Sequence, residues 1–517
     1  MKAKIYSILF AAASVFGYTS CDSLDLVSES SIADSGYWKD ADQFKAMHTG
    51  IASYFRGQSY NYFVYGELRS NIYGGSPFGG EATQGLENVY NNTLSVVNAG
   101  VSNYGKLYDV INQINLMIAK TTDATTIKEA DKNYYLGEAY GLRAYLYFHL
   151  LRSYGDVILY LDYTSGTTLD LSNLNRSQDP AASVMAQIKS DIAASEAAFG
   201  GNYAFTQGKY YWSLGATKML KGEVYLWSGK QMGGGESDYK TALQALQEVK
   251  NCPNVALLDS YAEVFSFGKK RNNEVIFALY NGENETSLFN GSWSGSYLPQ
   301  QAYMNNGSYY TEDGENVKNT TDSEINGLLR APLQTDLYDK LYLDNDPRKR
   351  NNLRGVYRKN EAGELYYEAS YPYKYKGTLL KGASTRSWYD DHIIYRYADC
   401  LLLIAEAKVL LGQDIADEIN AVRKRAYGEA YSDAVAYPND KGDFYVNNAY
   451  VGGDEDPVEA VLKERLREMI FEGRRWYDIR LFNMTDKYSL SISSKLLWPI
   501  DQGTLTNNNK LNQTSGY

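Results

Sequence analysis

The sequence has little cysteine and little histidine, which excludes several classes of site. Both residue types are scattered along the 517 residues, at Cys21, Cys252, Cys400, His48, His149 and His392. Three cysteines cannot form a disulfide framework, and the spacing of the histidines indicates no metal cluster. We therefore expect no metal and no cofactor, and we expect Cys252 and Cys400 to be buried free thiols.

Basic charge is also scarce, because 51 lysines and arginines stand against 62 aspartates and glutamates, for a formal net charge of −11. A nucleic-acid-binding protein needs a basic surface that displaces counterions from phosphates. The charge pattern therefore argues against nucleic acid as a partner.

The acidic turns Asp344–Asp346 and Asp454–Asp456 do not complete a set of calcium ligands, and we interpret both as solvated turns.

Motifs of the common enzyme classes are missing. The sequence contains no HExxH or CxxC zinc motif and no phosphate-binding glycine loop. It contains no GxSxG nucleophile elbow, since Gly291–Gly295 has a tryptophan where the serine would stand. We therefore predict a binding protein rather than an enzyme. A glycoside hydrolase remains an alternative, because it needs only two suitably spaced carboxylates.

Residues 1–20 have the features of a secretory signal. Lys2 and Lys4 precede an apolar run, Ile5–Phe16, that is shorter than the ~20 residues needed to cross a bilayer. Tyr18–Cys21 is similar to a bacterial lipobox, although tyrosine stands where leucine is usual. We expect lipidation at Cys21 and a tether over residues 21–35, so that the chain is anchored by lipid only. The alternative is an ordinary signal peptide followed by a chance cysteine.

The body of the chain has a helical pattern. Apolar and aromatic residues recur at steps of four and three in Glu129–Tyr154, and Gly155 is a suitable end for that helix. Two helical pairs are expected further on, at residues 211–228 with 239–249 and at residues 393–411 with 415–426. Each pair has about the ~34-residue period of tetratricopeptide-like repeats. The sequence thus predicts a mainly α fold in which such hairpins form a scaffold.

Three long segments lack helical periodicity, at residues 59–100, 261–330 and 346–389. They are rich in glycine, asparagine and serine, and they hold many of the 49 tyrosines of the chain. Such aromatic density argues for ordered loops rather than disorder, and a long ordered loop is usually functional. We expect irregular ligand-binding loops that decorate a single domain spanning residues 36–517.

Ordered motifs along the chain resemble those of one known protein family. Ile394–Ala407 resembles the family's R-x-A-D-x-L-L-x-x-A-E-A helix, and Lys463–Arg480 resembles its E-R…E-x-x-F-E-G-x-R-x-x-D-x-R block. Tyr140–Val157 resembles the LRA-x-x-Y-F…Y-G-D-V-P segment, with Ile158 in place of proline, and Leu497–Tyr517 resembles the C-terminal tail. Together these motifs resemble the SusD/RagB family of outer-membrane lipoproteins from Bacteroidetes. We interpret most of the motif residues as structural. Glu464, Glu468 and Glu472, for example, are spaced for ion pairs on a helix surface.

The resemblance implies a cell-surface protein of the outer membrane that captures an oligo- or polysaccharide. It also implies a SusC-like TonB-dependent outer-membrane transporter as partner, on which the helical face would sit as a lid. The family has peptide-binding members, so capture of peptides is the second hypothesis. A sugar site combines aromatic rings with hydrogen-bonding side chains. Two loops have this composition, and the predicted ligand-binding residues are Arg69, Asn71, Tyr73, Phe78, Trp293, Tyr297, Gln300 and Tyr303.

Overall fold

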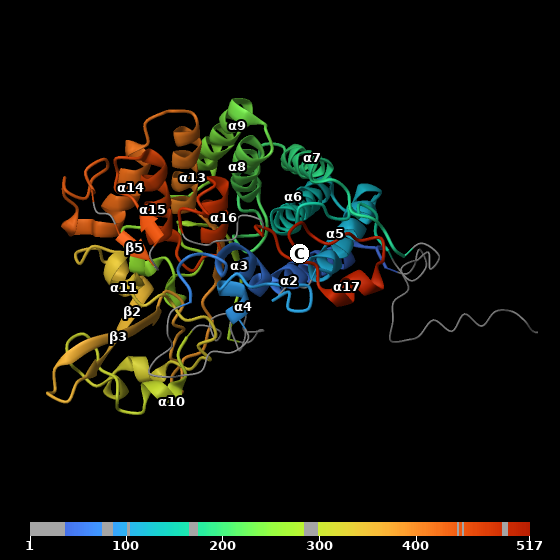
Figure 1. Cartoon of the computed structure of the whole chain (residues 1–517). Helices are drawn as coiled ribbons and strands as arrows, with labels where there is room; N and C mark the ends of the chain where they lie inside the picture. The colour runs from blue at the N-terminus through green and yellow to red at the C-terminus, as the bar shows by residue number, and fades with distance from the viewer. Residues whose placement is uncertain are drawn as a thin grey trace, which may run out of the picture.

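The computed structural model (Figure 1) describes most of the chain after the N-terminal segment. Its described residues are 37–74, 86–100, 104–164, 174–283, 298–441, 452–488 and 495–517, with the backbone alone at 444–446 and 449–451. The predictions for Cys21, Phe78, Trp293 and Tyr297 lie outside these residues, as do the signal and the tether.

Helices dominate the structure, which confirms the mainly α prediction. The α-helices are α2 (Ala41–Arg56), α3 (Ser59–Glu67), α4 (Glu87–Tyr90), α5 (Lys106–Thr122), α6 (Glu129–Tyr154), α7 (Ala181–Phe199), α8 (Leu214–Gln231), α9 (Gly235–Glu248), α10 (Gln301–Met304), α11 (Leu337–Lys340), α12 (Arg348–Asn352), α13 (Tyr397–Leu410), α14 (Ala416–Tyr427), α15 (Pro457–Met469), α16 (Arg475–Leu481) and α17 (Gln502–Asn507). Within the described residues, no helix has both the length and the apolar character that crossing a bilayer would require.

The scaffold consists of helices that pack against one another, most of them against neighbours in the chain. α6 packs on α5 and α7, α8 on α9, and α13 on α9, α14 and α15, and Figure 1 shows these helices along one side of the molecule. Gly222 lets α8 approach α9 closely, because a Cβ at this position would lie 2.5 Å from the Leu246 side chain. Gly155, with φ of +79°, ends α6 where the sequence predicted.

The strands form antiparallel pairs. β1 (Val275–Leu279) pairs with β4 (His392–Arg396), β2 (Leu353–Lys359) with β3 (Leu365–Pro372), and β5 (Phe444–Val446) with β6 (Ala449–Val451). In the first pair Leu279 lies opposite His392, and in the second Leu353 lies opposite Pro372. The β2–β3 hairpin extends away from the scaffold beside α10 and α11 (Figure 1).

Three boundaries differ from the sequence prediction. The helix expected from residue 393 begins at Tyr397, because His392–Arg396 pairs with β1 instead. Ser59–Glu67, expected as loop, is helix α3, and nearly all of its side chains are buried. The segment 346–389 contains the β2–β3 hairpin, whose tyrosines favour a strand.

A dense set of buried charges joins α15 to its neighbours. Glu464, Glu468 and Glu472 were predicted to form ion pairs on a helix surface, but all three are buried. Their partners come from other elements: Glu464 pairs with Arg423 of α14 at 2.9 Å and with Arg348 of α12 at 2.6 Å. Arg396 of β4 pairs with both Glu468 and Glu472 at 2.7 Å. The family motif residues therefore cross-link the fold.

Candidate ligand-binding site

Arg69, predicted to bind ligand, is fully buried. Its guanidinium lies over the rings of Trp476 and Trp498, 4.8 and 5.4 Å from their centroids. It donates to the carbonyl oxygen of Leu497 at 2.8 Å, and also to that of Lys495. Burial lowers the pKa of Arg69 to about 10. In this structure Arg69 therefore holds the C-terminal segment and does not face an open surface.

The other described candidates also lie away from the cavity described below. Asn71 and Tyr73 are buried, and Tyr73 forms an isolated β-bridge with Leu333. Gln300 precedes α10 and its carbonyl accepts the backbone N–H of Tyr303 at 3.1 Å. The ring of Tyr303 is half-buried against the core. A sequence does not show which side chains are exposed, so residues that are buried or half-buried in the structure were expected in open loops.

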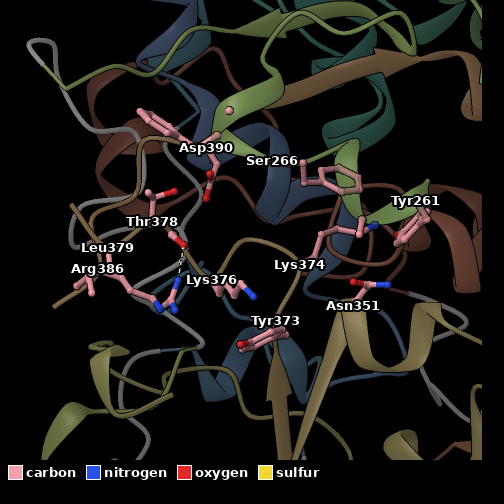
Figure 2. A pocket seen from close by; sticks show the side chains of 15 residues that line it. Tyr261, Ser266, Asn351, Tyr373, Lys374, Lys376, Thr378, Leu379, Arg386 and Asp390 are labelled. Carbon is pink, nitrogen blue, oxygen red and sulfur yellow. Dashed lines mark hydrogen bonds between the residues drawn. The ribbon is translucent and has the colours of Figure 1, made fainter. Parts of the chain in front are cut away.

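A cavity of about 440 Å³ lies between two loop segments and the end of a strand. We call it the 261–390 cavity, and Figure 2 shows its side chains. It is lined by Tyr261, Ala262, Phe265, Ser266, Phe267, Gly268, Asn351, Tyr373, Lys374, Lys376, Gly377, Thr378, Leu379, Arg386 and Asp390. Its volume is in the range of pockets that hold small molecules.

Aromatic side chains form part of the wall, and several are held in place by polar contacts. The Tyr261 hydroxyl donates to Asn352 Oδ1 at 2.8 Å, and the Tyr373 hydroxyl donates to Asp322 Oδ1 at 2.9 Å. Phe265 packs against the Tyr375 ring, with centroids 5.3 Å apart. Rings fixed in this way cost little entropy when a ligand packs on them.

The loop after β3 supplies the polar groups. Gly377, with φ of +78°, turns the chain so that Thr378 forms a β-bridge with Ser387. A Cβ at Gly377 would lie 2.8 Å from the Ser387 carbonyl oxygen, so this turn requires glycine. Arg386 Nη1 donates to the Gly377 carbonyl at 3.0 Å, drawn as a dashed line in Figure 2. The loop is thus fastened at its base.

Charged side chains reach the cavity from both ends of this loop. Lys374 is buried and donates to Glu472 Oε1 at 2.7 Å, while burial lowers its pKa to about 8. Burial raises the pKa of Asp390 to about 7. Lys376 is half-buried, and its ammonium lies 4.0 Å from the centroid of the Tyr373 ring. The cavity can therefore offer ring stacking together with charged and neutral hydrogen-bond donors.

All the lining residues except Asp390 fall within two of the three long segments that were predicted as ligand-binding loops, but none of them is among the predicted ligand-binding residues. One signal was available. The run Tyr373-Lys374-Tyr375-Lys376 alternates aromatic and cationic residues. It directly follows the end of β3 at Pro372, and Tyr373, Lys374 and Lys376 all line the cavity.

A second hollow of about 410 Å³ lies beside α2. It is lined by Thr49, Ala52, Ser53, Arg56, Tyr210, Tyr211, Leu279 and Tyr280. Tyr210 donates to Asp391 Oδ2 at 2.6 Å, and its ring lies 5.0 Å from that of Tyr280. Asp391, which follows Asp390 of the 261–390 cavity, thus contacts a residue that lines the second hollow. Among the residues that the structure describes, no cluster of histidine, cysteine or acidic side chains could hold a metal.

Two family descriptions match the chain. Residues 266–491 match the SusD family, and residues 42–207 match a family described as starch-binding and associating with the outer membrane. The first match contains most of the 261–390 cavity, and the second covers the first half of the helical scaffold.

Individual relatives extend the match to nearly the whole chain. NanU of B. fragilis is 52% identical, with a TM-score of 0.90 over 95% of this chain and 99% of its own. SusD-like protein P38 of Formosa agariphila is 25% identical over 96% of both chains. A laminarin binding SusD-like protein, 22% identical, shares the fold with a TM-score of 0.70 over 93% of this chain and all of its own. With its motifs, its fold and these matches in agreement, the chain belongs to the SusD/RagB family.

Proposed function

We propose that this protein is a cell-surface glycan-binding lipoprotein, and that its ligand occupies the 261–390 cavity. The observation that carries the proposal is the combination of fixed aromatic rings with inward polar groups in one cavity. Sugars present apolar C–H faces and hydroxyl groups, which such a wall can bind together. The starch-binding description of the matched family and the laminarin-binding relative support a glycan as ligand.

Truncation of a cavity ring tests the proposal. Phe267 is half-buried in the cavity, with Lys270 Nζ 5.2 Å from its ring centroid. Phe205 is its matched control, because it is also half-buried and has Lys209 Nζ 5.0 Å from its centroid. A glycan array identifies a saccharide, and calorimetric titration measures its affinity. We expect Phe267→Ala to weaken binding by up to about tenfold, and Phe205→Ala to leave it unchanged.

Two results would overturn the proposal of a glycan. One is a folded wild-type protein that binds no saccharide on the array but co-purifies with peptides. The other is equal affinity of the wild type and Phe267→Ala for the best saccharide, which would move the ligand away from this cavity. Release of reducing ends by the wild type would contradict our further proposal that the protein binds glycan without cleaving it.

We also propose anchoring at Cys21 and delivery of the ligand to a TonB-dependent outer-membrane transporter. The matched family is described as associating with the outer membrane. An extended helical scaffold is a surface that repeat proteins often use to dock partners. Gentle affinity purification from detergent extracts should recover a barrel-class partner with the wild type. Cys21→Ala should release the protein from membranes, and recovery of the wild type alone would contradict delivery through a stable complex.

A further inference from the structure

The second hollow, beside α2, has a wall of aromatic rings and hydroxyl groups of its own. Its volume of about 410 Å³ is close to the volume of about 440 Å³ of the 261–390 cavity. Among the residues that the structure describes, none lines both. The second hollow is therefore a separate place for a ligand, outside the site proposed above.

One wall of the second hollow is a face of α2. Thr49, Ala52, Ser53 and Arg56 line it, and their spacing places them on one side of the helix. The first three are small, so they leave room between the helix and the opposite wall. The Thr49 hydroxyl donates to the Lys45 carbonyl at 3.0 Å, which leaves its oxygen able to accept a hydrogen bond from a ligand.

The opposite wall consists of tyrosine rings. Tyr210, Tyr211 and Tyr280 line it, and all three are half-buried. The Tyr211 ring stacks on the buried His48 ring, with centroids 4.6 Å and planes 20° apart. The Tyr210 and Tyr280 rings have centroids 5.0 Å apart and planes at 58°. These rings are thus supported by the protein on one side, and a ligand that stacks on them loses little side-chain entropy.

The charged groups around the second hollow are oriented by the protein itself. Arg56 is the one charged side chain among its described lining residues, and its Nη1 donates to the Tyr280 carbonyl at 3.2 Å. The Tyr210 hydroxyl donates to Asp391 Oδ2, and Asp391 also pairs with Lys270 at 2.9 Å. The other polar side chains of the lining carry hydroxyl groups, which both donate and accept as the hydroxyl groups of a sugar do.

We propose that the second hollow is a second saccharide-binding site, in which a neutral sugar ring stacks on the tyrosines while its hydroxyl groups bond to Thr49 and Ser53. This inference rests on the proposed glycan function and adds a site to it. A neutral sugar matches this wall because its C–H faces pack on rings and its hydroxyl groups need partners that donate and accept.

Lys270 links the second hollow to the 261–390 cavity. Its ammonium lies 5.2 Å from the ring centroid of Phe267, which lines the cavity, and 5.0 Å from that of Tyr280, which lines the second hollow. It also donates to the carboxylate of Asp391 and to the carbonyl of Asn281. Two saccharide sites so close together would hold one polysaccharide more tightly than either site does alone.

Two substitutions on opposite walls test the inference. Ser53→Trp fills the second hollow from α2, and Ser190→Trp is its control, because both serines are exposed and lie within helices. Tyr280→Leu removes one ring and its hydroxyl. Tyr225→Leu is the control for it, since Tyr225 is also half-buried and has Lys189 Nζ 4.3 Å from its ring centroid.

The probes are the neutral saccharides of a glycan array, with affinities then measured by calorimetric titration. We expect a neutral saccharide whose affinity falls about tenfold in Ser53→Trp and in Tyr280→Leu, as for loss of a ring contact, and stays unchanged in both controls and in Phe267→Ala. Wild-type affinity of Ser53→Trp and Tyr280→Leu for every saccharide that binds would overturn the inference and leave glycan binding in the 261–390 cavity intact. Absence of any saccharide binding would overturn the proposed function as well.

Discussion

At the scale of the residue, Arg69 shows how one side chain can serve structure where the sequence suggested binding. Its guanidinium satisfies the carbonyl groups of residues 495–497 and lies on two buried indole rings. Removal of such a buried set of donors lowers the free energy of unfolding strongly. The carbonyl groups would lose their hydrogen bonds at a place where no water can replace the donors.

Arg69→Met should therefore destabilise the protein without acting on the ligand. We expect a loss of about 2–4 kcal/mol in the free energy of unfolding, measured by urea denaturation. Arg176→Met is the control, since Arg176 is exposed and its guanidinium lies 4.8 Å from the Tyr160 ring centroid. A loss of glycan affinity in folded Arg69→Met protein, as large as that expected for Phe267→Ala, would instead assign Arg69 to the binding site.

Two titrating side chains of the 261–390 cavity make ligand binding dependent on pH. Lys376, with a pKa of about 8, loses its charge as the pH rises through 8. Asp390, with a pKa of about 7, loses its negative charge as the pH falls through 7. Both changes make the cavity more positive as the pH falls. The affinity for the saccharide identified on the array should therefore change between pH 6 and pH 9, and the change should be smaller in Lys376→Arg. An affinity that stays constant over that range would contradict this prediction.

At the scale of the element, α15 is held by buried charge as well as by the apolar side chains that it contributes to the core. Its carboxylates bind arginines of α12, α14 and β4, and these arginines lower the pKa of Glu464 and Glu468 to about 2 against burial. A carboxyl group whose pKa is lower in the folded state stabilises the fold above its unfolded pKa. That contribution is lost as the pH falls from about 4.5 towards 2.

Glu468→Gln should cost about 3–5 kcal/mol in the free energy of unfolding at pH 7, because Arg396 and Arg425 keep their buried charge. The difference from the wild type should shrink as the pH falls from 4.5 to 2, where the wild-type carboxylate is also neutralised. The exposed Glu236, paired with Lys240 at 2.6 Å, provides the control. Chemical denaturation at several pH values measures the free energy of unfolding of the wild type, of Glu468→Gln and of the Glu236 control. A difference between Glu468→Gln and the wild type that does not change with pH would contradict the role of the charge.

At the scale of the whole molecule, one hydrophobic core includes residues from Phe44 to Ile500. Helices from both halves of the chain share it, since α3 packs on α16 and α8 packs on α13 and α16. We therefore predict that residues 36–517 unfold as one unit. Scanning calorimetry should give a single transition with equal calorimetric and van't Hoff enthalpies.

Gly222→Ala sharpens this test of cooperativity. The added methyl group would lie 2.5 Å from the Leu246 side chain, so it should lower the midpoint of the transition. If the chain is one unit, the whole transition shifts and stays single. Gly50→Ala is the control, because nothing lies within 4 Å of a Cβ there and alanine favours the helix. A split into two transitions would show that the scaffold unfolds separately from the loops.

The sequence by itself determined the local elements and the family. The periodicity of Glu129–Tyr154 and its glycine end gave α6 its bounds, because a helix depends on contacts within about four residues. The ordered motifs identified the SusD/RagB family, and free buried Cys252 and Cys400 were expected and confirmed. These features depend on near neighbours along the chain or on residue identity alone.

Only the tertiary structure decided which side chains are buried and which meet in a cavity. His392–Arg396 is a strand because β1 pairs with it, and Arg69 is buried because the C-terminal segment covers it. The 261–390 cavity joins Phe267, Lys376 and Asp390 from separate stretches of the chain. Burial, pairing and the resulting pKa of Lys376 depend on contacts between residues distant in the chain, and no local pattern encodes those contacts.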